Sequence, residues 1–154
     1  MENHPNVLAV RAALGDTAPE MVVFDEGVHT AAAAAAALGV EIGQIANSLI
    51  FEADGEPLLV LTSGAHRVDT KKVAAALGLA ELGRATPEFV REHTGQPIGG
   101  VAPVGHPRPV RTLVDVELAL YDEIWAAGGV PRAVFPITYP ELLRVTDGTP
   151  MDVA

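Results

Sequence analysis

The sequence predicts a mixed α/β fold, with helices packed on the outside of one β-sheet. Apolar runs typical of strands alternate along the chain with helical segments that have recognisable ends. Two pairs of these runs are joined by tight glycine-containing turns, which indicates hairpins and therefore antiparallel neighbours in the sheet. We expect residues 1–154 to form a single domain, with a sheet that is curved or closed like a barrel around one core.

Each expected helix has a start or stop signal. Thr30 and Asp69 stand where N-caps belong, Gly39 and Gly78 close the same two helices, and Thr138 has capping-box spacing to Glu141. The expected helices are Pro5–Leu14, Ala31–Leu38, Thr70–Leu77, residues 87–93 and a segment that follows Thr138.

The expected strands are residues 21–24, 47–53, 57–62, 112–116, 122–127 and 132–137. Asp54-Gly55 joins the second strand to the third, and Gly128-Gly129 joins the last two. Residues 58–61 are apolar at every position, which is typical of a strand covered on both faces. Beyond Gly148 we expect a frayed tail.

The chain is strongly acidic, with a formal net charge of −10. This charge disfavours broad, non-specific binding of nucleic acid, but it leaves room for contact with one nucleotide end. Lys71 and Lys72 are adjacent and follow His66 and Arg67 closely. The group is either a small local basic patch or an ordinary solvated start of a helix.

Composition also limits the chemistry and the compartment. The chain has no cysteine, which excludes disulfides, a thiol nucleophile and cysteine-ligated metals. No apolar run is long enough to cross a bilayer, and the first residues lack the basic start and apolar block of a signal peptide. We therefore expect a cytoplasmic protein that does not contact the membrane.

Residues 95–109 form the most unusual segment, because they hold four glycines and four prolines in fifteen positions. Such a loop is stiff, takes special dihedral angles and presents backbone N–H groups rather than side chains. Gly99, Gly100 and Gly105 would let a ligand approach the main chain, where N–H groups hold a carboxylate, a phosphate or an oxyanion. An ordinary rigid turn explains the same pattern equally well.

Familiar catalytic motifs are absent from the sequence. The histidines His29, His66, His93 and His106 show no metal-binding spacing, and neither Ser48 nor Ser63 lies in a nucleophile elbow. No phosphate-binding glycine motif follows a strand. From the histidine spacing we expect no bound metal, and from the missing glycine motif we expect no cofactor. The polar residues that remain at strand ends are Asn47, Ser48, Ser63, Gly64 and His106, and each also has an ordinary structural explanation.

Five segments occur in an order that is more specific than any one motif. They are residues 30–40, 47–51, 59–64, 67–72 and 98–106, which read TAAAAAAALGV, NSLIF, LVLTSG, RVDTKK and IGGVAPVGH. This order resembles the YbaK type of aminoacyl-tRNA editing domain, also called the prolyl-tRNA synthetase associated domain family, over about residues 22–145. The resemblance implies a barrel-like mixed sheet and hydrolysis of the ester that joins a wrong amino acid to a tRNA 3′ end. The family contains both free-standing proteins and domains inserted in synthetases, and the length of this chain favours a free-standing protein.

The resemblance also implies a site. The family's Gly-x-x-x-Pro loop, which lies over the aminoacyl group, falls on Gly99 to Pro103, and the backbone of Gly99, Gly100 and Val101 would stabilise the oxyanion. A water activated by the substrate's own ribose hydroxyl would attack. The expected substrate-binding residues are Thr30, Ser48, Ser63, Gly64, Lys71, Lys72, Ala102, Pro103, His106 and Gly128.

One position departs from the family pattern, because Asn47 stands where well-studied members carry a lysine that holds the substrate. We expect Asn47 to take part in catalysis, but asparagine forms hydrogen bonds and cannot neutralise a phosphate. The role of the lysine is therefore altered, weakened, or taken over by Lys71, Lys72 or Arg67.

Three functions follow from the sequence. The first is a trans-acting deacylase for a small amino acid on tRNA for proline or a related tRNA, with an aminoacyl-tRNA synthetase as an optional partner. The second is a non-catalytic module that binds a tRNA end or an aminoacyl nucleotide. The third is a metal-dependent hydrolase that uses His29, His66 or His106. The identity of the amino acid and the oligomeric state stay open.

Overall fold

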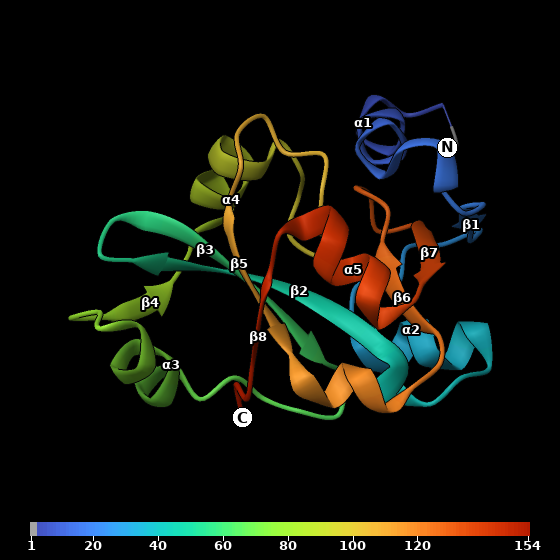
Figure 1. Cartoon of the computed structure of the whole chain (residues 1–154). Helices are drawn as coiled ribbons and strands as arrows, with labels where there is room; N and C mark the ends of the chain where they lie inside the picture. Colours follow the sequence, from blue (N-terminus) through green and yellow to red (C-terminus); the bar gives the residue numbers. More distant parts are fainter. Residues whose placement is uncertain (1–2) are drawn as a thin grey trace.

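The computed structural model describes residues 3–154, which form one mixed eight-stranded sheet with helices around it (Figure 1). Its strands are β1 (Val22–Val23), β2 (Ile45–Ala53), β3 (Glu56–Ser63), β4 (Leu82–Arg84), β5 (Arg111–Asp115), β6 (Ile124–Ala127), β7 (Ala133–Ile137) and β8 (Thr149–Met151). Their order is β1-β7-β6-β2-β3-β5-β8, and β4 pairs with β2. The predicted mixed sheet is confirmed. It is not closed into a barrel, because β1 and β8 lie at its two ends.

The helices are α1 (Pro5–Leu14), α2 (Ala31–Leu38), α3 (Thr70–Leu77), α4 (Pro87–Thr94) and α5 (Tyr139–Thr146), with short 3₁₀ turns η1 (Gly15–Thr17), η2 (Ile42–Gln44) and η3 (Val116–Leu120). Their starts follow the predicted caps. The Thr30 hydroxyl accepts a hydrogen bond from the Ala33 N–H at 3.1 Å, and the Asp69 carboxylate accepts one from the Lys72 N–H at 3.1 Å. Thr138 caps α5 in the same way.

Two antiparallel hairpins organise the sheet as predicted. In the β2–β3 hairpin, Asp54 and Gly55 both have positive φ, at 50° and 90°, which is the backbone of a tight hairpin turn. The second hairpin pairs β6 with β7. Strand β3 is buried on both faces: Leu59 and Leu61 belong to the main core, whereas Leu58 and Val60 belong to a second core beneath α3.

The C-terminal segment corrects one prediction. Residues 149–151 form β8, parallel to β5, and the side chain of Val153 is fully buried. The expectation of a frayed tail was therefore wrong. Without this segment, the N–H and C=O groups along one edge of β5 would lack partners, and the second core would lose Val153.

None of the helices in the described part of the chain combines the length and apolar character needed to cross a bilayer.

Candidate functional site

A gap in the sheet runs along β2. On one edge of this strand, β3 pairs with every residue from Ala46 to Ala53. On the other edge, β6 pairs only with Ile45 and Ala46, and β4 pairs only with residues 51–53. Residues 47–50 therefore have no strand beside them on that edge.

The direction of the free main-chain groups follows from the hydrogen bonding of Ile45. Its carbonyl accepts a hydrogen bond from the Gly64 N–H at 2.8 Å, on the β3 side of the strand. Successive residues of a strand turn their N–H and C=O groups toward opposite edges. Ser48 and Ile50 therefore present their backbone N–H and C=O groups to the gap.

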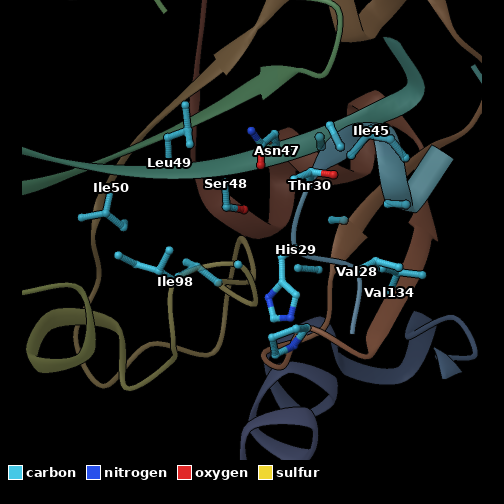
Figure 2. A pocket seen from close by; sticks show the side chains of 18 of the residues that line it. Val28, His29, Thr30, Ile45, Asn47, Ser48, Leu49, Ile50, Ile98 and Val134 are labelled. Carbon is cyan, nitrogen blue, oxygen red and sulfur yellow. The ribbon is translucent and has the colours of Figure 1, made fainter. Parts of the chain in front are cut away.

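A cleft of about 500 Å³ opens at this gap (Figure 2). Residues 47–51 of β2 form one wall, and residues 28–30 with Ile98, Gly99 and Val101 line the cleft as well. Strands β6 and β7 complete it with mostly small or apolar side chains: Trp125, Ala126, Ala127, Ala133 and Val134. Figure 2 shows Ser48 and Ile50 on the side of β2 that faces Ile98, and Leu49 on the opposite side. Such a largely apolar hollow with a few polar groups is the usual form of a small-molecule site.

Two polar atoms at the cleft have no partner within the described residues. They are the Ser48 hydroxyl and the Trp125 indole N–H, both buried. Burying a polar group without a hydrogen bond costs free energy, so such groups commonly form hydrogen bonds with a water or a ligand. Thr30 and Asn47 add two more polar side chains to the lining.

The charge of the cleft differs from that of the chain as a whole. Aspartate and glutamate account for 20 residues of the sequence, yet none of the described residues that line the cleft is acidic. Arg84, at the end of β4, is the one lysine or arginine among those lining residues, and His29 is the one histidine. The cleft is thus suited to a neutral or anionic ligand.

The glycine- and proline-rich loop meets the cleft through a turn. The Gly100 N–H donates to the Pro97 carbonyl at 2.9 Å, and Gly99 has a φ of 87°, as expected at the third position of a type II turn. The buried side chain of Gln96 accepts a hydrogen bond from the Ala102 N–H at 2.7 Å. The N–H groups of Gly100 and Ala102 are therefore already hydrogen-bonded within the loop.

The amides of Gly99 and Val101 remain available, since no acceptor within residues 3–154 takes a hydrogen bond from either of them. Both residues line the cleft. Among the loop residues predicted to stabilise an oxyanion, Gly99 and Val101 therefore keep an N–H group that is free within the described residues, whereas Gly100 does not.

Comparison with known proteins identifies the family. Residues 25–145 match the family of aminoacyl-tRNA editing domains. The chain belongs to this family. The resemblance that the sequence predicted is confirmed. A solved structure described as a candidate trans-editing enzyme for prolyl-tRNA synthetase superimposes on the editing domain with a TM-score of 0.90 at 42% identity, covering 97% of this chain and 96% of that one.

Curated relatives include both large synthetases and a protein of similar size. The proline–tRNA ligase of Nitratidesulfovibrio vulgaris (strain DP4) is 38% identical over 102 residues, which are 66% of this chain but only 18% of the ligase. YwhH of Bacillus subtilis (strain 168) is 30% identical over 124 residues, covering 80% of this chain and 78% of YwhH. The editing domain thus spans less than a fifth of the ligase that it matches.

The predicted site residues separate into two groups in this editing domain. Thr30, Asn47, Ser48, Gly99 and Val101 come together at the cleft. The remaining predicted residues do not line it: Ser63, Gly64, Lys71, Lys72, Gly100, Ala102, Pro103, His106 and Gly128. Gly100 and Ala102 contribute to the shape of the loop, so their part is indirect.

Ser63 and Gly64 are engaged in the end of β3. The buried Ser63 hydroxyl donates to the Gly43 carbonyl at 2.8 Å, and the Ser63 N–H donates to the Asp115 carboxylate at 3.0 Å. Gly64 lies so close to η2 that an added Cβ would come within 2.4 Å of the Ile42 carbonyl oxygen. Ser63 therefore joins the end of β3 to η2 and to the end of β5, and Gly64 packs against η2.

The two lysines lie on α3, away from the cleft lining. The Lys72 ammonium pairs with Asp152 at 2.9 Å and donates to the Ala154 carbonyl at 2.8 Å, so it ties α3 to the C-terminal segment. Lys71, like Lys72, is exposed.

The three histidines considered as metal ligands are in different places. His29 lines the cleft, His66 bonds Asp115 through Nδ1 at 2.9 Å, and His106 bonds the Ala102 carbonyl through Nε2 at 2.8 Å. Within residues 3–154, no three histidine, aspartate or glutamate side chains are placed to hold one metal ion.

His106 gives the loop a pH dependence. Burial lowers its pKa below the ordinary value of 6.5, although its hydrogen bond to the Ala102 carbonyl acts in the opposite direction. The folded chain therefore favours neutral His106, and the unfolded chain binds the proton more readily. The resulting stability is present above about pH 6.5 and is lost as the pH falls through the lowered pKa.

We expect the free energy of unfolding to fall between about pH 8 and pH 5, and His106→Gln to make that fall shallower. Urea unfolding of both proteins across this range measures the difference, and glutamine retains a donor for the Ala102 carbonyl. Equal pH slopes for the two proteins would contradict the role of His106.

Proposed function

We propose that this editing domain hydrolyses, in trans, the ester that joins a wrongly attached small amino acid to the 3′ end of tRNA, with tRNA for proline as the first candidate. The single observation that carries the proposal is the pair of uncommitted amides, Gly99 and Val101, at a cleft that holds no carboxylate. Membership of the editing family and the likeness to a candidate trans-editing enzyme support it.

In the proposed reaction, a water oxygen attacks the acyl carbon of the ester. The carbonyl oxygen becomes an oxyanion, which the N–H groups of Gly99 and Val101 stabilise. The neighbouring ribose hydroxyl of the substrate relays the proton: it accepts one from the attacking water and donates its own to the esterified ribose oxygen. The bond between the acyl carbon and that ribose oxygen then breaks, and the oxygen leaves as a hydroxyl group. The products are a free amino acid and an uncharged tRNA, and no serine or cysteine nucleophile is needed.

The cleft also supports the choice of a small amino acid. Alanine side chains recur in its lining, and the set is Ala31, Ala34, Ala46, Ala85, Ala126, Ala127 and Ala133. The apolar surface favours a small side chain without charge. Trp125 would limit the room for larger groups, and we expect the domain to act in the cytoplasm, where charged tRNA is used.

The test is a panel of tRNAs for proline that carry alanine, serine, cysteine or proline. We expect the protein to shorten the ester lifetime of at least one wrong amino acid far below its spontaneous value, and to spare the prolyl ester. A repeat with prolyl-tRNA synthetase present measures whether this partner supplies tRNA affinity. Binding of charged tRNA without faster hydrolysis would contradict the proposal and favour a non-catalytic binding module.

A further inference from the structure

Arg84 is a cleft residue whose side chain forms no ion pair within the described residues. It ends β4, and its side chain is exposed and lines the cleft. A guanidinium without an ionic partner, beside a cleft without carboxylates, attracts an anion. The ligand that reaches Arg84 is therefore expected to carry a negative charge.

The register of the strands sets how far the backbone of Arg84 lies from Ser48 along β2. Arg84 is opposite Phe51 in the β2–β4 ladder, three positions along β2 from Ser48. At a rise of about 3.4 Å per residue, this separation is about 10 Å. An anion at Arg84 is thus well separated from a group that contacts Ser48.

The loop amides belong to the Ser48 end. Gly99 follows Ile98 and lies against His29, since a Cβ at Gly99 would be 3.1 Å from the His29 Nδ1 atom. Figure 2 shows Ser48 facing the space between Ile98 and His29. Gly99 and Ser48 therefore flank the same part of the cleft, and Arg84 stands farther along β2.

We propose that Arg84 binds the 5′ phosphate of the terminal nucleotide of the substrate. This inference rests on the proposed deacylase function. In an aminoacyl nucleotide the ribose lies between the ester and the 5′ phosphate, so a phosphate must lie beyond the ribose when the acyl carbon is beside Gly99 and Val101. A guanidinium binds phosphate through two parallel hydrogen bonds.

The proposal also accounts for the asparagine at position 47. Asn47 cannot neutralise a phosphate. Lys71, Lys72 and Arg67, which the sequence offered as substitutes, all lie outside the cleft lining. Arg84 reaches the cleft from a different strand and supplies the missing positive charge. It also provides a local site for one end of a polyanion on a chain with a net charge of −10.

The experiment compares two small substrates, the aminoacyl ester of adenosine and the same ester carrying a 5′ phosphate. We expect the wild-type protein to prefer the phosphorylated ester by about 10- to 100-fold in kcat/KM, mainly through KM, as one charge-assisted contact provides. Arg84→Gln removes this preference, because it lowers kcat/KM for the phosphorylated ester much more than for the unphosphorylated one. Arg84→Lys keeps part of the preference.

The matched control is Arg91→Gln, which removes the same charge from an exposed position on α4 outside the cleft lining. It should keep the full preference for phosphate. A preference that survives in Arg84→Gln, or an equal loss on both esters, would overturn the assignment of Arg84 and leave the deacylase function standing.

A binding measurement keeps the two proposals separate. Calorimetry with adenosine 5′-monophosphate and with adenosine measures the contribution of the phosphate without any turnover. Tighter binding of the monophosphate by the wild-type protein but not by Arg84→Gln supports Arg84 even if neither ester is hydrolysed, in which case only the deacylase function fails. Equal binding of adenosine and adenosine 5′-monophosphate by both proteins overturns the role of Arg84.

Discussion

Gly100→Ala lowers the kcat of deacylation by about 100-fold or more. Gly100 is buried, and a Cβ added there would lie 2.7 Å from the backbone carbon of Val130 and 2.8 Å from the Pro131 nitrogen. Both neighbours are backbone atoms, so neither can rotate away. The turn that contains Gly100 must shift, and it carries the adjacent amides of Gly99 and Val101 out of position.

The effect is measured by single-turnover hydrolysis of the mischarged tRNA that the panel described above identifies as a substrate. Gly83→Ala is the control, because its added Cβ meets no atom nearer than the Glu52 carbonyl oxygen at 4.0 Å. Gly100→Ala should also lose about 1–3 kcal/mol of stability through overpacking, so urea unfolding must show that the variant is folded in the assay. A kcat within about threefold of wild type would remove the loop amides from the mechanism.

Asp115→Ala destabilises the protein by about 3–5 kcal/mol. The Asp115 side chain is fully buried at the end of β5 and accepts hydrogen bonds from the N–H groups of Ser63 and Glu117, each at 3.0 Å. His66 Nδ1 lies 2.9 Å from the same carboxylate, and the Thr62 hydroxyl lies 3.3 Å from it. Alanine would leave donors from the end of β3, from the loop that follows it and from η3 without this acceptor.

Urea unfolding monitored by the fluorescence of Trp125, the sole tryptophan, measures the loss. Asp122→Ala is the control, since it removes one exposed carboxylate and should change stability by less than about 0.5 kcal/mol. Asp115→Asn should lose less stability than Asp115→Ala, because asparagine retains one acceptor oxygen. A loss below about 1 kcal/mol for Asp115→Ala would show that water replaces the carboxylate.

Local signals explain why most of the fold could be predicted from the sequence. Thr30 and Asp69 mark helix starts through hydrogen bonds that span only three residues, and Asp54-Gly55 determines a hairpin by its own backbone preferences. Strands β4 and β8 were missed, because each has three residues and no alternating pattern. They form because a neighbouring strand has a free edge with which each can pair. That edge is present only in the tertiary structure.

The same distinction applies to the candidate site. Thr30, Asn47, Ser48, Gly99 and Val101 lie in segments that the family order marks, and they meet at the cleft. Their catalytic and binding roles remain predictions.

Other cleft features depend on information that the sequence order does not contain. Arg84 reaches the cleft through the register of β4 on β2, which could not be predicted when the strand itself was missed. Gln96 supports the loop through a buried side chain that carries no sequence signature. The lysines of α3 are close in sequence to the end of β3, but the helix carries them away from the gap.

The gap along β2 also affects the association of one copy of the protein with another. An uncovered strand edge is a template on which a second chain can add its own strand, and long edges of this kind promote aggregation. Here β6 and β4 close both ends of the free stretch, which leaves only residues 47–50 open. A strand from another copy would collide with one of these neighbours before it could form a ladder, so β2 keeps main-chain groups accessible to a small molecule while resisting intermolecular pairing.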